Sequence, residues 1–379
     1  MTRILVFTLL ALAASCAPQR NKAGAGTQTS LPLDKIKLPP GFQIQLWAEN
    51  VKNARSLCLS PSGTLFVGTR DAGNVYALKD TDGDYKADQR YTLATGLNMP
   101  NGVAFKNGSL YVAEVNRILR FDDIEKKLAN PGTPTVVYDQ YPTETHHGWK
   151  YIAFGPDGKL YVPVGAPCNV CERENPIFSS LTQLDVEQPN PEPVVVQHGI
   201  RNTVGFTWHP ANKELWFTDN GRDMMGDDMP GCELNRATLE GQHFGFPYCH
   251  QGNAPDPKFG EKRPCADFVP PAQILNAHVA PLGLEFYQGD QFPETYRRQI
   301  ILAEHGSWNR TKKSGYKLSL VRLNEQGTCI SYETFAGGWL QPDESVWGRP
   351  VDLEHLPDGS LLVSDDYADA IYRIVYKGR

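Results

Sequence analysis

The chain repeats one phrase: a short apolar strand, a turn built on Pro or Gly, and a second apolar strand. The phrase stands at residues 60–67, 105–112, 155–162, 209–217 and 356–363. A longer gap before the last copy holds one degraded copy, around 292–303, which brings the number of units to six. Repetition at roughly 40 to 50 residues, with only strand and turn signals inside each unit, predicts an all-β fold, a six-bladed β-propeller.

The two ends of the repeat region are also strand-like. Residues 42–47 precede the first unit, and residues 370–375 end the last one. We expect these segments to pair and close the ring, because an open array would leave a free sheet edge.

The bulk composition fits one exported domain. The 379 residues carry a formal net charge of −6, which argues against a nucleic-acid partner. Residues 1–16 read as a signal peptide that ends in a lipobox at Cys16, and simple cleavage is the alternative. Residues 17–34 read as a flexible tether and 35–379 as the propeller. We therefore expect a periplasmic protein anchored to the outer membrane only through a lipid on Cys16.

Seven cysteines follow Cys16, an odd number for an oxidising compartment. Cys168 and Cys171 are expected to form a small loop disulfide, because Glu172 stands where covalent haem attachment would need histidine. One pair is expected among Cys232, Cys249 and Cys265. Cys58 and Cys329 lie in strand-like, buried contexts, so at least one thiol should stay free.

Polar residues gather at one end of the predicted hairpins. The residue that enters the first strand of a unit and the residue that leaves the second strand lie at the same end, opposite the Pro/Gly turn. One mouth of the channel should therefore collect the following side chains: Arg55, Asn98, Asn101, His146, His147, Arg201, Asn202 and Arg349 on the entering side, and Thr69, Arg70, Glu114, Asn116, residues 219–222, Glu304, His305, Asp365 and Asp366 on the leaving side.

Three of the arginines at this mouth, Arg70, Arg201 and Arg349, indicate a ligand with planar carboxylates or phosphates. The alternative is that they pair with Asp365, Asp366 or Glu304 across the channel. His147 is a candidate general base because an unperturbed imidazole titrates near neutrality.

Two segments could bind calcium. Residues 219–223 leave a strand and turn at Gly221, which exposes backbone carbonyls to a hard cation. Asp80, Asp82, Asp84 and Asp88 alternate as in a calcium loop, although no glutamate closes the loop as in an EF-hand. A solvated acidic hairpin is the other interpretation of the second segment.

Longer motifs add a family resemblance. From about residue 35 to the C-terminus the chain resembles the L-sorbosone dehydrogenase branch of the pyrroloquinoline quinone (PQQ) dependent sugar dehydrogenases. It is more distantly similar to soluble quinoprotein glucose dehydrogenase, a six-bladed propeller. The motifs that carry the resemblance are residues 38–42, 96–105, 146–149, 199–206, 217–223 and 304–310.

The resemblance implies a role for most of the mouth. His147 would be the general base, while Arg201 and Asn202 would contact the quinone oxygens. The backbone carbonyls of Gly221 and Arg222 would hold the active-site calcium. The remaining cofactor contacts would come from Arg349, Arg70 and Asn101, and from His305, Arg310 or Lys312 in place of a fifth-blade lysine. The implied reaction oxidises a sugar or sugar aldehyde by hydride transfer to PQQ, after which an external acceptor takes the electrons.

Two departures from the glucose enzyme stand out. The aspartate that orients its histidine aligns with Ala166, and a second arginine aligns with Val351. Two other functions are therefore kept: a calcium-dependent lactonase that uses Glu114, Asp219 and Asp365, and a cell-surface binding scaffold with a decayed PQQ site. The sequence does not identify the sugar.

Overall fold

The computed structural model describes residues 31–378, and its compact unit spans Leu33–Arg379. The predicted signal peptide, Cys16 and most of the predicted tether lie outside the described residues. The sequence predicts a tether up to residue 34, whereas a 3-10 turn, η1, forms at Leu33–Lys35 in the structure. No helix within 31–378 has the length and apolar character needed to cross a membrane.

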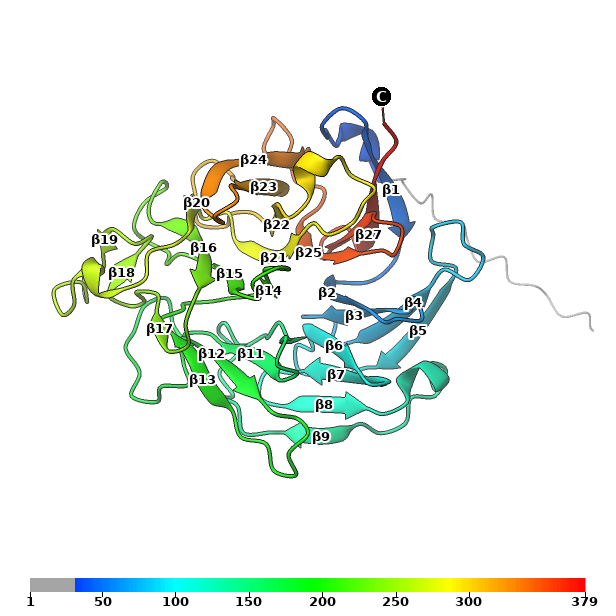
Figure 1. Cartoon of the computed structure of the whole chain (residues 1–379), viewed down its shortest axis with the longest axis horizontal. Coiled ribbons are helices and arrows are strands. Elements are labelled where there is room, and N and C mark those ends of the chain that lie inside the picture. Colours follow the sequence, from blue (N-terminus) through cyan, green and yellow to red (C-terminus); the bar gives the residue numbers. More distant parts are fainter. Residues whose placement is uncertain (1–30, 379) are drawn as a thin grey trace, which may run out of the picture. The chain divides into compact units, whose positions relative to one another are not determined.

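The compact unit is a six-bladed β-propeller, as the repeat predicts, and Figure 1 shows the blades around a common centre. The first three blades are built from β2 (Ala54–Leu59), β3 (Leu65–Thr69), β4 (Val75–Lys79) and β5 (Gln89–Ala94); β6 (Gly102–Lys106), β7 (Ser109–Ala113), β8 (Ile118–Phe121) and β9 (Thr135–Tyr138); and β10 (Ala153–Phe154), β11 (Leu160–Val164), β12 (Ser180–Leu184) and β13 (Val194–His198).

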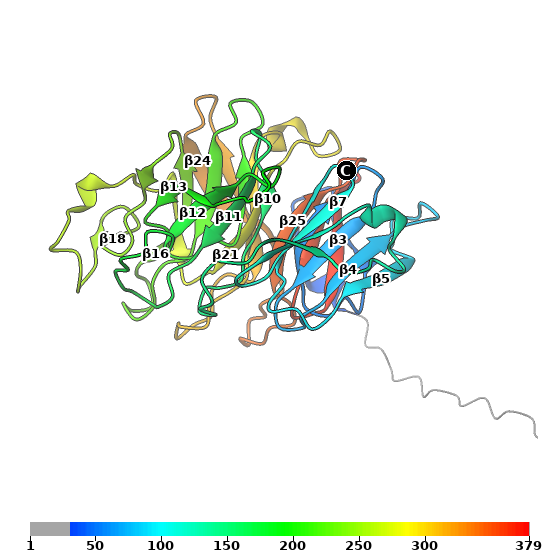
Figure 2. The ribbon, with the colours of Figure 1, turned by 90° about the horizontal axis from the view of Figure 1, so that it is seen from below.

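The last three blades are built from β14 (Phe206–Trp208), β15 (Leu215–Asp219), β16 (Gly231–Ala237) and β20 (Gln273–Ala277); β21 (Pro281–Phe286), β22 (Ile300–Glu304), β23 (Lys317–Leu323) and β24 (Cys329–Gly337); and β25 (Pro350–His355), β26 (Leu361–Asp365), β27 (Ala370–Tyr376) and β1 (Phe42–Ala48). Short 3-10 turns stand at Ile124–Lys126 (η2), Cys265–Asp267 (η3) and Glu294–Tyr296 (η4). Figure 2 shows β3, β4 and β5 of the first blade side by side.

The hydrophobic core is divided into clusters, most of which join successive blades. One cluster joins Phe66 and Ala77 of the first blade to Val103, Leu110 and Val112 of the second. The inner strands are buried over most of their length; β3 and β15, for example, have no exposed residue. Burial on both faces explains why these strands read as continuous apolar runs.

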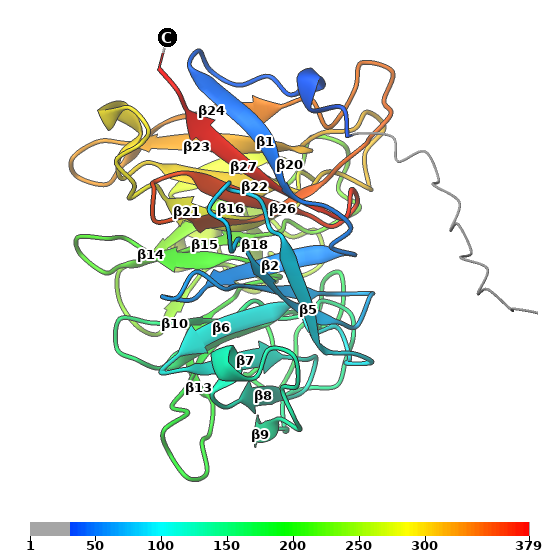
Figure 3. The same ribbon diagram turned by 90° about the vertical axis from the view of Figure 1, so that its right-hand side faces the viewer.

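The ring closes as predicted. β1 pairs antiparallel with β27, from Phe42 opposite Tyr376 to Ala48 opposite Ile371, and Figure 3 shows the two strands side by side. The Phe42 ring also packs edge-on against Phe292, Tyr296, Phe335 and Tyr376, with centroid distances of 4.7 to 5.2 Å.

A long excursion between β16 and β20 holds three short strands, β17 (Gln242–His243), β18 (Cys249–His250) and β19 (Ala254–Pro255). A disulfide joins Cys249 to Cys265 there, and another joins Cys168 to Cys171, so both cysteine predictions are confirmed. Three thiols of the described chain are free: Cys232 is buried, whereas Cys58 and Cys329 are only partly so.

Candidate functional site

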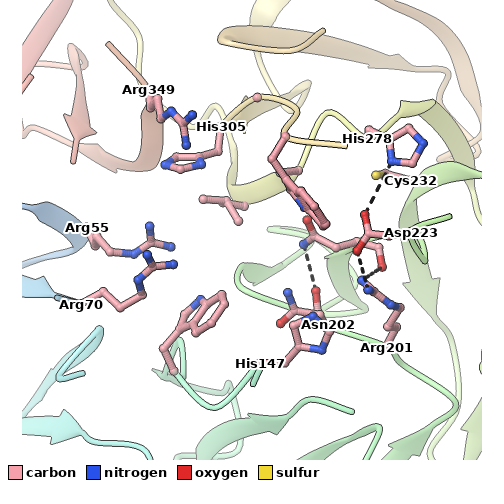
Figure 4. Close-up of a pocket in the computed structure, with 17 residues that line it drawn as sticks. Arg55, Arg70, His147, Arg201, Asn202, Asp223, Cys232, His278, His305 and Arg349 are labelled. Carbon is pink, nitrogen blue, oxygen red and sulfur yellow. Dashed lines mark hydrogen bonds and ion pairs between the residues drawn. The ribbon is translucent and has the colours of Figure 1, made fainter. Parts of the chain in front are cut away.

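One cavity of about 350 Å³ opens at the channel mouth opposite the Pro/Gly turns. It takes side chains from blades one, three, four, five and six, as strand-end geometry requires, and Figure 4 shows them facing a common space. The lining residues are Arg55, Arg70, His147, Trp149, Arg201, Asn202, Asn220, Gly221, Asp223, Cys232, His278, Ala280, Leu282, His305, Gly306, Trp308 and Arg349.

Two of the arginines are available to a ligand. The Arg349 guanidinium lies over the rings of Tyr316 (5.4 Å) and Tyr367 (5.8 Å) and has no ion-pair partner within 31–378. Its Nε is buried without a hydrogen bond. Arg70 stacks on Trp149 at 4.9 Å, and its one ion pair among the described residues is with Asp71, whose side chain is 60% exposed and therefore well screened by water.

The predicted pairing of arginines with Asp365, Asp366 or Glu304 does not involve Arg70, Arg201 or Arg349. Asp366 instead accepts from Arg55 Nη1 (2.6 Å) and His305 Nε2 (2.8 Å). Burial alone would raise the pKa of Asp366, but the contacts with His305 and Arg55 outweigh it and hold the pKa well below its usual range. Burial lowers the pKa of His305, and Asp366 offsets part of that effect.

Asn101 does not line the cavity, contrary to its expected place among the cofactor contacts. It is fully buried behind Arg55, where its Oδ1 accepts from Arg55 Nε at 2.6 Å and its Nδ2 donates to the Lys150 carbonyl at 2.9 Å. The position of Asn101 at a strand end correctly predicts that it lies near the channel mouth. It does not show that Arg55 covers it.

Arg201 is fixed by contacts on every side of its guanidinium. Its Nη2 reaches Asp223 at 3.2 Å, and its Nε and Nη2 reach the backbone and side-chain oxygens of Asn169 at 2.9 and 3.0 Å. The Arg201 and Asn202 backbone N–H groups both donate to Asp219, at 2.8 and 2.6 Å. Burial raises the pKa of Asp219 to about 6, although these two N–H groups favour its charged form.

His147 is oriented by a backbone carbonyl. Its Nδ1 lies 2.8 Å from the Ala166 oxygen, so Nδ1 carries the proton and the lone pair of Nε2 is left free. Burial, aided by Arg201 and His146, lowers the pKa of His147 to about 3, so the imidazole is neutral at physiological pH. The position that lacks the aspartate of the glucose enzyme thus holds the histidine through its main chain.

The turn after β15 contains two backbone carbonyls that accept no hydrogen bond from the described residues. No residue within 31–378 donates a hydrogen bond to the carbonyl of Gly221 or Arg222. A Cβ on Gly221 would lie 2.9 Å from the Gly231 carbonyl, so the close approach of the two backbones requires glycine. The Arg222 side chain turns away and pairs with Asp256.

Other predicted residues are not brought into the cavity. Arg310 pairs with Asp228 at 2.8 Å and lines a separate cavity. Asp80, Asp82 and Asp88 have carboxylate oxygens within 4.8 Å of one another at the surface, whereas Asp84 is not part of this group.

Several lining residues have no role predicted from the sequence, among them Trp149, Asp223, Trp308, Cys232 and His278. Trp149, Asp223 and Trp308 stood inside the recognised motifs, so the signal was present. No sequence signal marks Cys232 or His278, because neither residue lies next to a copy of the strand-turn-strand repeat. The Asp223 carboxylate, 3.8 Å from His278 Nδ1, raises the pKa of His278.

Fold and site together define a class of protein: a six-bladed propeller with an arginine-rich cavity at one mouth of its channel. Within that class, residues 36–377 match the sequence model of the TrAA12-like family. The chain belongs to this family.

Relatives extend the comparison. An uncharacterized protein of Borreliella burgdorferi is 34% identical over 90% of this chain and 91% of its own length. A pyrroloquinoline quinone-dependent sugar dehydrogenase of Hypocrea jecorina is 23% identical over 65% of this chain and 69% of its own.

Two solved structures share the fold. The holo form of the PQQ domain of pyranose dehydrogenase from Coprinopsis cinerea superposes with a TM-score of 0.77 at 17% identity, covering 90% of this chain and 97% of that domain. The calcium structure of a Trichoderma reesei carbohydrate-active enzyme of family AA12 superposes with a TM-score of 0.76 at 21% identity, over 92% and 98%.

Proposed function

We propose that the protein is a PQQ- and calcium-dependent dehydrogenase that oxidises a sugar or a sorbosone-type sugar aldehyde and passes the electrons to an external acceptor. The observation that carries the proposal is Arg349, a cation without an ion-pair partner in the described chain, with a buried bare Nε, facing a cavity that Arg55, Arg70 and Arg201 also line. The dehydrogenases with which the chain shares its fold and family motifs support the same conclusion.

The donor set fits a planar tricarboxylate. Arg349 and Arg70 would hold its carboxylates, since their guanidinium groups can bind carboxylate through two parallel hydrogen bonds. The buried, unpartnered Nε1 of Trp149 is a further donor at the same wall. Arg201 and Asn202 would face the quinone oxygens, with Arg201 held rigid by Asp223 and Asn169.

The donor set also fits calcium, because the bare carbonyls of Gly221 and Arg222 are the hard oxygen ligands that this ion prefers. Asp223 adds negative charge beside them. We keep the surface group Asp80, Asp82 and Asp88 as a second calcium site.

When bound, PQQ supplies a quinone that accepts a hydride. The chain supplies the base: the free Nε2 of His147 would take the proton of the substrate hydroxyl, while the Ala166 carbonyl holds the ring in place. Because the lowered pKa keeps the ring neutral at neutral pH, its Nε2 is unprotonated and can serve as an acceptor.

Trp308, at the edge of the cavity, offers a surface on which a sugar ring could stack. Trp308 lines the cavity yet is 71% exposed, and its loop is fixed by the Tyr316 hydroxyl, which donates to the Ser307 carbonyl at 2.6 Å. An exposed indole on a loop that is held at the preceding residue offers an apolar face to the C–H side of a sugar ring.

The alternative functions have less support. Glu114, Asp219 and Asp365, the carboxylates needed for a lactonase, accept hydrogen bonds from their own blades and do not line the cavity. A binding scaffold remains an outcome of the test below.

We also propose that the protein is exported and carries a lipid anchor at Cys16, because residues 1–16 resemble a signal peptide with a lipobox.

The test is reconstitution of the purified apo-protein with PQQ and calcium, followed by absorption spectra and dye reduction with a panel of aldoses and sugar aldehydes. We expect stoichiometric binding and turnover. Arg349→Ala should weaken PQQ binding by about tenfold or more, as expected for a lost charge-assisted contact. Arg297→Ala, a surface arginine paired with the exposed Glu294, is the matched control.

Absence of PQQ binding by the wild-type chain would sink the proposal. Binding without turnover on the panel would favour the scaffold.

A further inference from the structure

One irregular loop contacts the proposed base, His147, and also Arg201 and Asp223 beside it. This disulfide loop, residues 165–172, follows the end of β11 at Val164 and contains the Cys168–Cys171 bridge. It precedes the start of β12 at Ser180 by several residues without strand structure, so no sheet holds it in place.

Asn169, inside the four-residue bridge, holds two neighbouring segments together. Its carbonyl and Oδ1 accept from Arg201 Nε and Nη2 at 2.9 and 3.0 Å. Its Oδ1 also accepts from the Asp223 backbone N–H at 2.8 Å, and its Nδ2 donates to the Asp223 carbonyl at 3.0 Å. Both polar ends of one amide are thus used to tie Arg201 to the turn that contains Gly221.

The same loop carries the contact that orients the base. The Ala166 carbonyl holds His147 Nδ1, and the Ala166 N–H donates to the Arg201 carbonyl at 2.8 Å. At its other end, Glu172 accepts from the Tyr248 hydroxyl at 2.8 Å. The loop therefore fixes His147 and Arg201 relative to each other.

We propose that Asn169 is a positioning residue for the reaction, and that the Cys168–Cys171 bridge keeps it in place. A short covalent ring leaves the enclosed backbone few conformations, so Asn169 reaches Arg201 and Asp223 at little further cost in entropy. The catalytic part of this inference rests on the proposed function, whereas the ordering of the cavity wall can be measured without any ligand.

The first experiment uses Asn169→Ala, with Asn169→Asp as the conservative variant and Asn130→Ala, at an exposed position, as control. Asn169→Asp keeps an acceptor for Arg201 and the Asp223 N–H but loses the donor to the Asp223 carbonyl. We expect Asn169→Ala to lower kcat at least about tenfold with a smaller change in KM, and to weaken PQQ binding. Asn169→Asp should recover part of the loss.

The second experiment needs no cofactor. Hydrogen–deuterium exchange of the full apo-protein should speed up at residues 219–224 in Asn169→Ala and in the double variant Cys168→Ser/Cys171→Ser. It should not change there in Asn130→Ala.

The two experiments separate the possible failures. Unchanged exchange in both variants would overturn the inference, whatever the wild type binds. Wild-type kcat and PQQ affinity in Asn169→Ala would overturn it as well. If the wild type binds no PQQ but exchange rises as expected, the proposed function fails while the positioning role of the loop stands.

Discussion

At the scale of single residues, the ring of the candidate base, His147, is oriented by a main-chain oxygen rather than by a carboxylate. The Ala166 carbonyl fixes the His147 tautomer but carries no charge, so it stabilises an imidazolium less than an aspartate would. His147→Ala should therefore keep PQQ bound while turnover falls about 10²-fold or more. Cofactor titration and steady-state rates measure the two effects separately, and unchanged turnover would remove His147 from its role.

The protonation of His147 gives a second prediction at this scale. Its pKa is about 3 in the folded chain against an ordinary value of 6.5, so the unfolded chain binds more protons between these values. Stability should therefore fall as pH drops from about 6.5 towards 3, and His147→Gln should lose less stability over that range. Chemical denaturation of the two apo-proteins across this pH range is the measurement; parallel pH profiles would contradict it.

Trp308 gives a third prediction, on substrate binding. If its exposed indole stacks on the sugar, Trp308→Ala should raise KM by about tenfold and leave PQQ affinity unchanged. Val194→Ala, at a position that is 60% exposed on the edge of another blade, is the control for a change at an exposed apolar side chain. An equal loss of PQQ affinity would instead make Trp308 part of the cofactor site.

The sequence predicts which residues line the cavity only where they stand at the end of a strand. Arg70, Arg201 and Arg349 follow from their places next to repeat phrases, and all three line the cavity. Asn101 obeys the same rule yet is covered by Arg55, because side-chain length decides which of two neighbours reaches the channel. The Ala166 carbonyl could not be foreseen, since a main-chain contact depends on loop conformation and leaves no mark on residue identity.

At the scale of elements, glycine decides how closely loop and base approach. A Cβ on Gly165 would lie 2.6 Å from the Cβ of His147 and 2.8 Å from its carbonyl. His147 itself has a φ of 53°, in the left-handed region. The strand that ends at Val164 and the turn at His147 thus pack without room for one more carbon atom.

Gly165→Ala should displace His147 and lower both stability and turnover, by about 1–3 kcal/mol in stability as for other overpacked sites. Gly337→Ala is the control, because a Cβ there would meet only the Thr334 methyl group at 3.4 Å. Thermal unfolding and steady-state rates check the pair. A Gly165→Ala protein with wild-type turnover would show that the loop can move aside.

At the scale of the whole propeller, the repeat predicted the number of blades and the pairing that closes the ring. The fifth blade was the weakest in sequence, because its inner turn is replaced by a longer segment that includes η4 (Glu294–Tyr296). The strands β21 and β22 nevertheless pair as in the other blades. Strand pairing across a blade depends on apolar pattern, so it survives the loss of the turn signal.

The closure can be tested at Phe42, whose side chain is 8% exposed and contacts four aromatic rings. Phe42→Ala should cost about 3–5 kcal/mol of unfolding free energy. Equilibrium unfolding in denaturant is the measurement, with Val194→Ala as the matched surface change. A cost below about 1 kcal/mol would mean that the pairing of β1 with β27 contributes little.

Ring closure also sets an order of events in biosynthesis. Arg55 and Arg70 belong to the first blade, whereas Arg349 immediately precedes the first strand of the last blade. A nascent chain that still lacks β27 cannot bring these side chains to one cavity, however well its earlier blades have folded. We therefore expect ligand binding in the cavity only after β27 has been made, so that a bound ligand reports the pairing of β1 with β27.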